Sequence, residues 1–209
     1  TGRPTGDETL TVNPVANSIY DAKGMAASTS QSNNTVKLNE IAPTTVLSVS
    51  SSTADGLYNI GDVISIQVTF SKDVNVSGTP QLNLETGSTD GVANYSSGTG
   101  SSVLSFNYTV FNDHVSSDLD YQDTTSLSLN GGTINDLLSS AVVLTLPEPA
   151  ATNSLGANKA IVIDGIIPTF TNIAISADNT SLSVTYSESV FNTNSGSGSL
   201  EASDFEMSV

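Results

Sequence analysis

The stretch Val63-Ile64-Ser65-Ile66-Gln67-Val68-Thr69-Phe70 alternates apolar and polar side chains over its whole length. Successive side chains of a β-strand point to opposite faces, so the apolar residues share one face and the polar residues the other. The segment 104–110 has the same pattern. We therefore predict two strands with these residues facing a core: Ile64, Ile66, Val68, Phe70, Leu104, Phe106 and Tyr108.

Shorter apolar runs continue the pattern on both sides of these strands. They are Val46–Val49, Gln81–Leu84, Leu127–Leu129, Val142–Leu146 and Ala160–Ile163. Turn-forming clusters separate them: Asp55-Gly56, Asp90-Gly91, Ser96–Ser102 and Gly131-Gly132. About seven short strands with turns between them are typical of a β-sandwich, so we predict an all-β fold with two antiparallel sheets spanning 43–164. No amphipathic helix of ordinary length is evident, and 135–141 is expected to form at most one helical turn.

The composition agrees with this fold class and excludes some functions. Charged residues make up only 12% of the chain, and short polar residues suit the solvent face of strands and turns better than helix surfaces. The 21 acidic and 5 basic residues give a net charge of −16. A nucleic-acid interface needs the opposite sign, and an anionic membrane surface would repel the chain. We therefore expect no nucleic-acid partner.

Cysteine is absent, which a sandwich of about 100 residues tolerates because its core is large enough to fold without disulfides. No apolar run approaches the roughly 18 to 20 residues of a membrane span, so no membrane insertion is expected. The sequence opens at Thr1 within a pattern, without a signal peptide, which leads us to expect a fragment or a processed product.

The chain contains internal echoes in a fixed order. Ile41-Ala42-Pro43-Thr44 recurs as Ile167-Pro168-Thr169. The segment 68–74 (VTFSKDV) recurs as 184–190 (VTYSESV), and 19–26 (IYDAKGMA) is echoed by 134–141 (INDLLSSA).

These echoes predict three segments. Residues 43–164 form one complete repeat, residues 1–42 carry the later signals of a preceding repeat, and residues 165–209 carry the opening signals of a following repeat. We name residues 1–42 the tail and residues 165–209 the head. Pairing the head of one subunit with the tail of the next would complete a second sandwich and build a filament. The alternative is a boundary that leaves both ends unpaired.

The central repeat resembles the bacterial immunoglobulin-like (Ig-like) repeats of large secreted adhesins. The residues that carry the resemblance are Asp55–Asp62, Gly78–Leu82, Asp118–Tyr121, Leu129–Ile134 and Ser154–Lys159. The head and tail resemble a second Ig-like type through Ala177–Thr180, Ser187–Phe191, Leu200–Phe205 and Asn17–Ala22. One departure is Ser139-Ser140, where such repeats usually carry a Gly-Asn turn. The resemblance implies an extracellular or cell-surface location.

Few residues offer chemistry for an enzyme. His114 is the only histidine and lies in the polar segment 112–114, where a solvated loop residue is expected. No Gly-x-Ser-x-Gly elbow surrounds a serine. A carboxylate pair for glycoside hydrolysis usually lies in an aromatic-lined cleft, and this chain is poor in aromatic residues. We predict a protein without enzymatic activity.

Calcium is the better chemical hypothesis. Asp113, Asp118, Asp120 and Asp123 are four carboxylates within eleven residues, and calcium takes six to eight oxygen ligands. If 117–121 is extended, Asp118 and Asp120 face the same way. The competing interpretation is a solvated loop whose aspartates cap turns, which is also our prediction for Asp21 and Asp136. By analogy with calcium-rigidified Ig-like arrays, Asp164 at the end of the repeat is a fifth candidate ligand.

The favoured function is a structural or adhesive module of a bacterial surface protein or fibre, which self-associates head to tail and has a glycan or protein receptor on a host or other surface. The alternative is a carbohydrate-binding β-sandwich, with an enzyme third. A carbohydrate site would use exposed planar side chains. Tyr58, Tyr95, Tyr108 and Tyr121 are available, and at least two of them are expected to point into the core.

Overall fold

A computed structural model of the chain describes residues 8–37, 42–193 and 196–206. The chain divides into two compact units, one ending at Thr45 and one beginning at Val46. The first contains β1 (Thr9–Thr11) and β2 (Thr35–Lys37), which pair antiparallel. No helix among the described residues is long and apolar enough to cross a membrane.

The second unit is built almost entirely of strands. Its elements are β3 (Val46–Ser51), β4 (Gly56–Asn59), β5 (Val63–Ser77), β6 (Gln81–Glu85), β7 (Gly91–Ser97), β8 (Ser101–Thr109), β9 (Val115–Ser116), β10 (Asp120–Tyr121), β11 (Leu127–Ser128), β12 (Thr133–Asp136), α1 (Leu155–Asn158), β13 (Ile161–Asp164), β14 (Phe170–Ile175), β15 (Leu182–Tyr186) and the 3₁₀ turn η1 (Ala202–Asp204). We call residues 46–164 the central domain.

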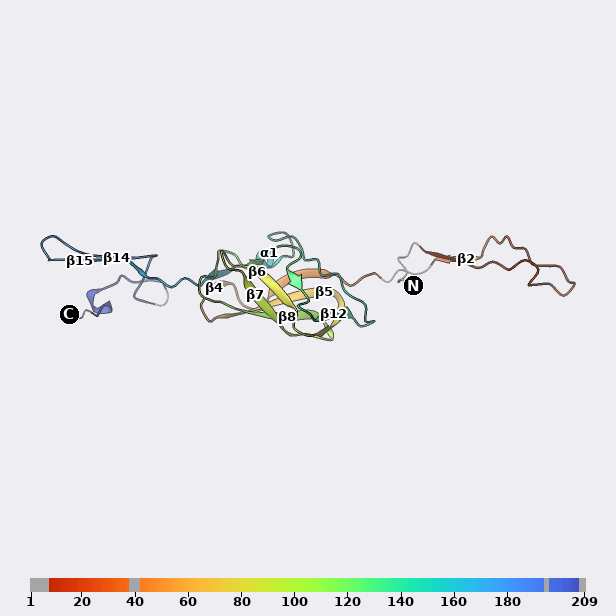
Figure 1. Ribbon diagram of the computed structural model, residues 1–209, viewed down its shortest axis with the longest axis horizontal. Helices are drawn as coiled ribbons and strands as arrows, with labels where there is room; N and C mark the ends of the chain where they lie inside the picture. The colour runs from red at the N-terminus through yellow and green to blue at the C-terminus, as the bar shows by residue number, and fades with distance from the viewer. Residues whose placement is uncertain (1–7, 38–41, 194–195, 207–209) are drawn as a thin grey trace. The chain divides into compact units, whose positions relative to one another are not determined.

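The large sheet of the central domain has the strand order β10-β6-β7-β8-β5-β12, with β11 also on β6 and β3 also on β5. Figure 1 labels β5, β6, β7, β8 and β12 of this sheet. All its pairings are antiparallel. The alternation of 63–70 places Ile64 opposite Tyr108 and Ile66 opposite Phe106 on β8. The predicted core is confirmed, because each residue of the predicted set is at most 2% exposed. The all-β prediction is likewise confirmed.

A smaller sheet covers the other side of this core and gives a sandwich-like architecture. Its order is β4-β13-β9, and Ile161 and Ile163 of β13 are buried in the same apolar cluster as β5 and β8. The β4–β13 pair is parallel, with Ile161 opposite Gly56 and Asp164 opposite Asn59. The prediction that both sheets would be antiparallel was therefore wrong. An early strand and the last strand of the domain run in the same direction, and local alternation carries no information about that pairing.

The expectation of at most one helical turn in 135–141 holds, because Thr133–Asp136 is strand β12 and a tight turn follows. Three other segments need correction. Val142–Leu146 forms no regular strand: Val143 is an isolated bridge residue, and Ala141, just before the run, bridges Asn135. Gly56–Asn59 and Gly91–Ser97 are strands, although the turn clusters beside them obscured both.

The turn after β12 has a counterpart in the tail. The Asp136 carboxylate accepts from the amides of Leu138 and Ser140 at 2.9 and 2.8 Å. The Asp21 carboxylate accepts from Lys23 and Met25 at 2.9 and 2.8 Å. These bonds lower the pKa of Asp21, those to Met25 and Lys23 being its leading causes. Both aspartates therefore cap turns, as the sequence predicted, and the echo between 19–26 and 134–141 is also an echo in geometry.

One residue of the turn after β12 lies in an unfavourable conformation. Ser139 has φ 62°, and its counterpart Gly24 has φ 81°. A side chain costs free energy in the left-handed region, and glycine does not carry that cost. This is the position at which the sequence departs from its family resemblance.

Replacing Ser139 with glycine is expected to raise the free energy of unfolding by about 0.5 to 1 kcal/mol. Chemical denaturation of the full chain measures it. The control is Ser140→Gly, which removes no positive φ and should only loosen the unfolded chain, with a small loss of stability. Equal effects at the two positions would contradict the explanation.

Candidate functional site

Two of the predicted calcium ligands lie together at one edge of the central domain. Asp118 and Asp120 line a shallow pocket of about 270 Å³ with Glu85 and Gln122. Burial raises the pKa of Asp118, and the charges of Asp120 and Asp55 raise it further. The negative charge of Asp118 is therefore disfavoured in this pocket, and a bound cation would offset that effect. Asp120 already accepts from the amides of Tyr121 and Ala150, each at 2.9 Å.

The other three candidate ligands lie in local turns. The side-chain hydroxyl and amide of Thr125 hold the pKa of Asp123 below its usual range. Asp164 accepts from the amide of Ile166 at 3.1 Å, and Asp113 has φ 65° in the loop before β9. Within the described ranges, no group of three or more His, Cys, Asp or Glu side chains is placed to hold a metal ion. The calcium site stays a prediction, centred on Asp118 and Asp120.

Calcium binding at this pocket would stabilise the folded state by mass action. We expect calcium to raise the melting temperature of the full chain and a chelator to reverse the rise. The double variant Asp118→Asn/Asp120→Asn should show no response, since its pocket has lost two of its three carboxylates. The matched control is Asp123→Asn, which should retain the response. A wild-type melting curve that calcium leaves unchanged would rule out the site.

His114 is not the solvated loop residue that the sequence predicted. It is 5% exposed, and its Nδ1 lies 2.8 Å from the hydroxyl of buried Tyr108. Burial raises the pKa of Tyr108 to about 12. The ring of Phe111 meets the His114 ring edge-on with centroids 5.7 Å apart. The loop is polar, but the histidine side chain turns inward and closes the end of the core.

The same loop is hydrogen-bonded to the chain at the point where the chain leaves the central domain. The Gly165 amide donates to the His114 carbonyl at 2.7 Å, and the Asp113 amide donates to the Gly165 carbonyl at 3.0 Å. A Cβ on residue 165 would lie 2.3 Å from the Phe111 carbonyl oxygen. Only glycine therefore fits between these backbones. Gly165, where the chain leaves the central domain, therefore has a structural role. The predicted ligand Asp164 accepts a hydrogen bond in the adjoining turn.

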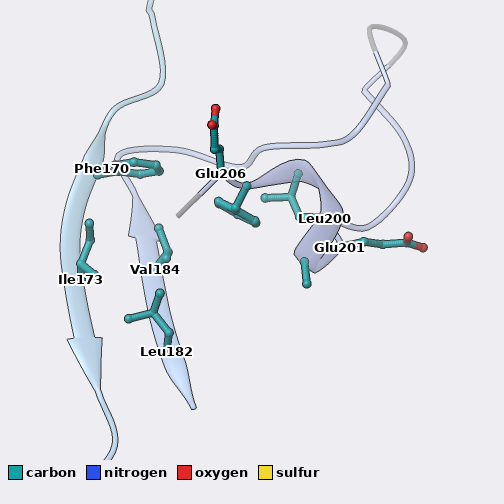
Figure 2. Close-up of a pocket in the computed structure, with 9 residues that line it drawn as sticks. Phe170, Ile173, Leu182, Val184, Leu200, Glu201 and Glu206 are labelled. Carbon is teal, nitrogen blue, oxygen red and sulfur yellow. The ribbon is translucent and has the colours of Figure 1, made fainter. Parts of the chain in front are cut away.

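An open apolar groove lies in the head. Figure 2 shows Phe170, Ile173, Leu182 and Val184 of the β14–β15 hairpin facing Leu200 across a gap. The groove has a volume of about 500 Å³, and Ala202 and Phe205 complete its apolar lining. Most of the hairpin side chains are half exposed: Phe170 54%, Ile173 56%, Ile175 63% and Leu182 50%.

The hairpin reproduces the pairing of β3 with β5 residue by residue. In the central domain Val46 lies opposite Phe70, a bulge follows, and Val49 lies opposite Val68. In the head Phe170 lies opposite Tyr186, a bulge follows at the same place, and Ile173 lies opposite Val184. The sequence echo 68–74 with 184–190 is therefore an echo of register as well.

The two ladders differ in how far they are covered. Val49 and Ile66 are fully buried in the central domain, whereas their counterparts Ile173 and Leu182 are 56% and 50% exposed. An apolar strand face of this kind packs against further strands in a sandwich. The arrangement is suited to binding a β-element, and Glu201 and Glu206 are the charged residues of its lining.

Comparison with family models, with curated proteins and with solved structures found no match. The candidate site therefore rests on the chain's own geometry. Sequence reasoning noted 200–205 only as part of a resemblance and missed its role as one wall of the groove. The signal was the spacing of Leu200, Ala202 and Phe205 after a glycine- and serine-rich loop, which is too short a pattern to predict a contact.

Proposed function

We propose that the chain is a structural or adhesive module of an extracellular bacterial surface protein or fibre, built from Ig-like sandwich repeats and without catalytic turnover. The observation that carries the proposal is the second copy of the β3–β5 ladder in β14–β15, with its bulge preserved. A chain that repeats one supersecondary unit stacks sandwiches along its length, which is the architecture of stalks and fibres. Subunits join head to tail.

The chemistry of the described residues supports this proposal. The single histidine is buried against Tyr108, so it is unavailable as a general base at the surface. The groove in the head has mostly apolar walls, which fit a protein segment better than a polar substrate.

The alternative is a carbohydrate-binding module, for which partly exposed tyrosines are the available platform. Tyr108 and Tyr121 are buried, as the sequence predicted for at least two of the four. The Tyr58 hydroxyl donates to the Ala54 carbonyl, and the Tyr95 hydroxyl accepts from the Thr99 amide. Tyr95 also packs edge-on against Phe106. These internal bonds favour a structural role for both remaining side chains.

Limited proteolysis and a glycan array test the proposal together. A structural or adhesive module is expected to yield a resistant fragment close to 46–164 and to give no glycan binding that depends on Tyr58 or Tyr95. Glycan binding that Tyr58→Ala or Tyr95→Ala removes would favour the carbohydrate-binding alternative. Rapid digestion throughout 46–164 would contradict a self-contained repeat.

A further inference from the structure

The geometry points to one occupant for the apolar face of β14–β15. We propose that it docks residues 8–37 of a second copy of this chain, with 19–22 in the register that β12 keeps on β5 inside the central domain. The inference deepens the proposed function, on which it rests, by naming the partner segment and its register.

The tail repeats the elements that follow β10 in the central domain. The Asp21 turn matches the Asp136 turn in its hydrogen bonds, and the bridge Tyr20–Ala26 matches Asn135–Ala141. Strand β2 lies as many residues before Pro43 as 160–162, which contains the first two residues of β13, lies before Pro168. The run 10–13 (LTVN) likewise matches 127–130 (LSLN). The head repeats the opening ladder, and the tail repeats the elements that cover such a ladder.

Three apolar side chains of the tail are exposed, and docking on the head would bury them. Leu10, Ile19 and Val36 are 50%, 55% and 57% exposed. Their counterparts Leu127, Ile134 and Ile161 are at most 3% exposed in the central domain. The same apolar positions are therefore buried where the covering strands have a ladder to pack on. Tail and head expose complementary halves of one apolar core.

Charge favours a head–tail pair over a head–head pair. Residues 165–209 carry five acidic side chains and no lysine or arginine, so two heads repel each other. Residues 1–42 hold three of the five basic residues of the chain, Arg3, Lys23 and Lys37, against four acidic ones. The nearly neutral tail is the partner that the acidic head tolerates best.

The central domain supplies the register. There β12 pairs with β5 so that Asn135 lies opposite Asn75 and Asp136 opposite Val74. In the repeat, Tyr20 corresponds to Asn135 and Phe191 to Asn75. Tyr20 of one copy should then lie opposite Phe191 of the next, and both rings are exposed, at 55% and 49%. Such a contact joins two different surfaces, so it propagates from copy to copy.

Cross-linking in this cysteine-free chain tests the register. The full chain with Tyr20→Cys and Phe191→Cys is oxidised, or treated with a short bis-maleimide, and run on a non-reducing gel. A ladder of covalent dimers, trimers and longer species is expected, since directly opposite Cβ atoms lie about 4.5 to 5.5 Å apart. Mixing the two single-cysteine variants should give dimers only.

The matched control is Tyr20→Cys with Val190→Cys. A shift of one residue moves the second cysteine to the other face of the strand, so the ladder should be lost. Equal ladders from both pairs, a cross-linked monomer, or no cross-link at millimolar protein would each overturn the proposal. The protease-resistant fragment 46–164 would survive those outcomes, so the repeat module of the proposed function would stand and only its head-to-tail joining would fall.

A pair of charge substitutions tests the apolar contact without cysteines. Ile19→Asp is expected to abolish self-association of the full chain in sedimentation velocity, because its counterpart Ile134 is buried. Met25→Asp adds the same charge at a 72% exposed residue whose counterpart is the polar Ser140, and assembly should persist. Loss of assembly in both variants would indicate nonspecific apolar association and would overturn the docking site.

Discussion

Replacing Phe106 with alanine is expected to lower the free energy of unfolding of the central domain by about 3 to 5 kcal/mol. The side chain is fully buried on β8, opposite Ile66 of β5 and Tyr95 of β7. The Tyr95 ring meets it edge-on at 5.9 Å. Removing the phenyl group forfeits its burial and leaves a cavity between two sheets that cannot collapse freely.

Denaturant titration of the full chain, followed by far-ultraviolet circular dichroism, measures this loss. The control is Asn107→Ala, the next residue of the same strand, whose side chain is on the exposed face. Its effect should stay within about 0.5 kcal/mol. A loss under about 1 kcal/mol for Phe106→Ala would show that the large sheet does not bury this face.

The fold was predictable where two faces of a strand differ in polarity. The alternation in 63–70 set which side of β5 faces the core, and with the matching run on β8 it foretold the buried layer. β4 was missed because Leu57 is 59% exposed and the strand has only four residues, so its partner β13 defines it rather than its own pattern. A parallel pair between distant segments leaves no local trace in the sequence.

The candidate site was predictable only through the internal echoes. The polar residues 112–113 predicted a solvated His114. They do form a loop, but the His114 ring is buried and packs edge-on against Phe111. The acidic residues were too many for spacing to separate ligands from turn caps, and Asp123 proved to be a cap. The echo of 68–74 with 184–190, in contrast, carried the register of β14–β15, since like sequences with like partners form like ladders.

A methyl group at Gly165 is expected to cost about 2 to 3 kcal/mol, as overpacking at a rigid site does. The obstacles to its Cβ are backbone atoms, the carbonyl oxygens of Phe111 at 2.3 Å and His114 at 2.7 Å. The His114 carbonyl accepts from the Gly165 amide and the Phe111 carbonyl from the His114 amide, so neither can rotate away without breaking a hydrogen bond. Gly165→Ala therefore pushes residue 165 away from the loop 111–115 and exposes the buried Tyr108–His114 pair.

The matched control is Gly156→Ala in α1. There the nearest atom is the Oδ2 of Asp120 at 3.0 Å, a side-chain atom bonded by the Ala150 amide that need move only slightly, and alanine favours a helix over glycine. Denaturant titration should therefore show a large loss for Gly165→Ala and little change, or a small gain, for Gly156→Ala. If both variants unfold at the wild-type midpoint, the loop 111–115 does not hold Gly165, and β13 is fixed by its ladders with β4 and β9 alone.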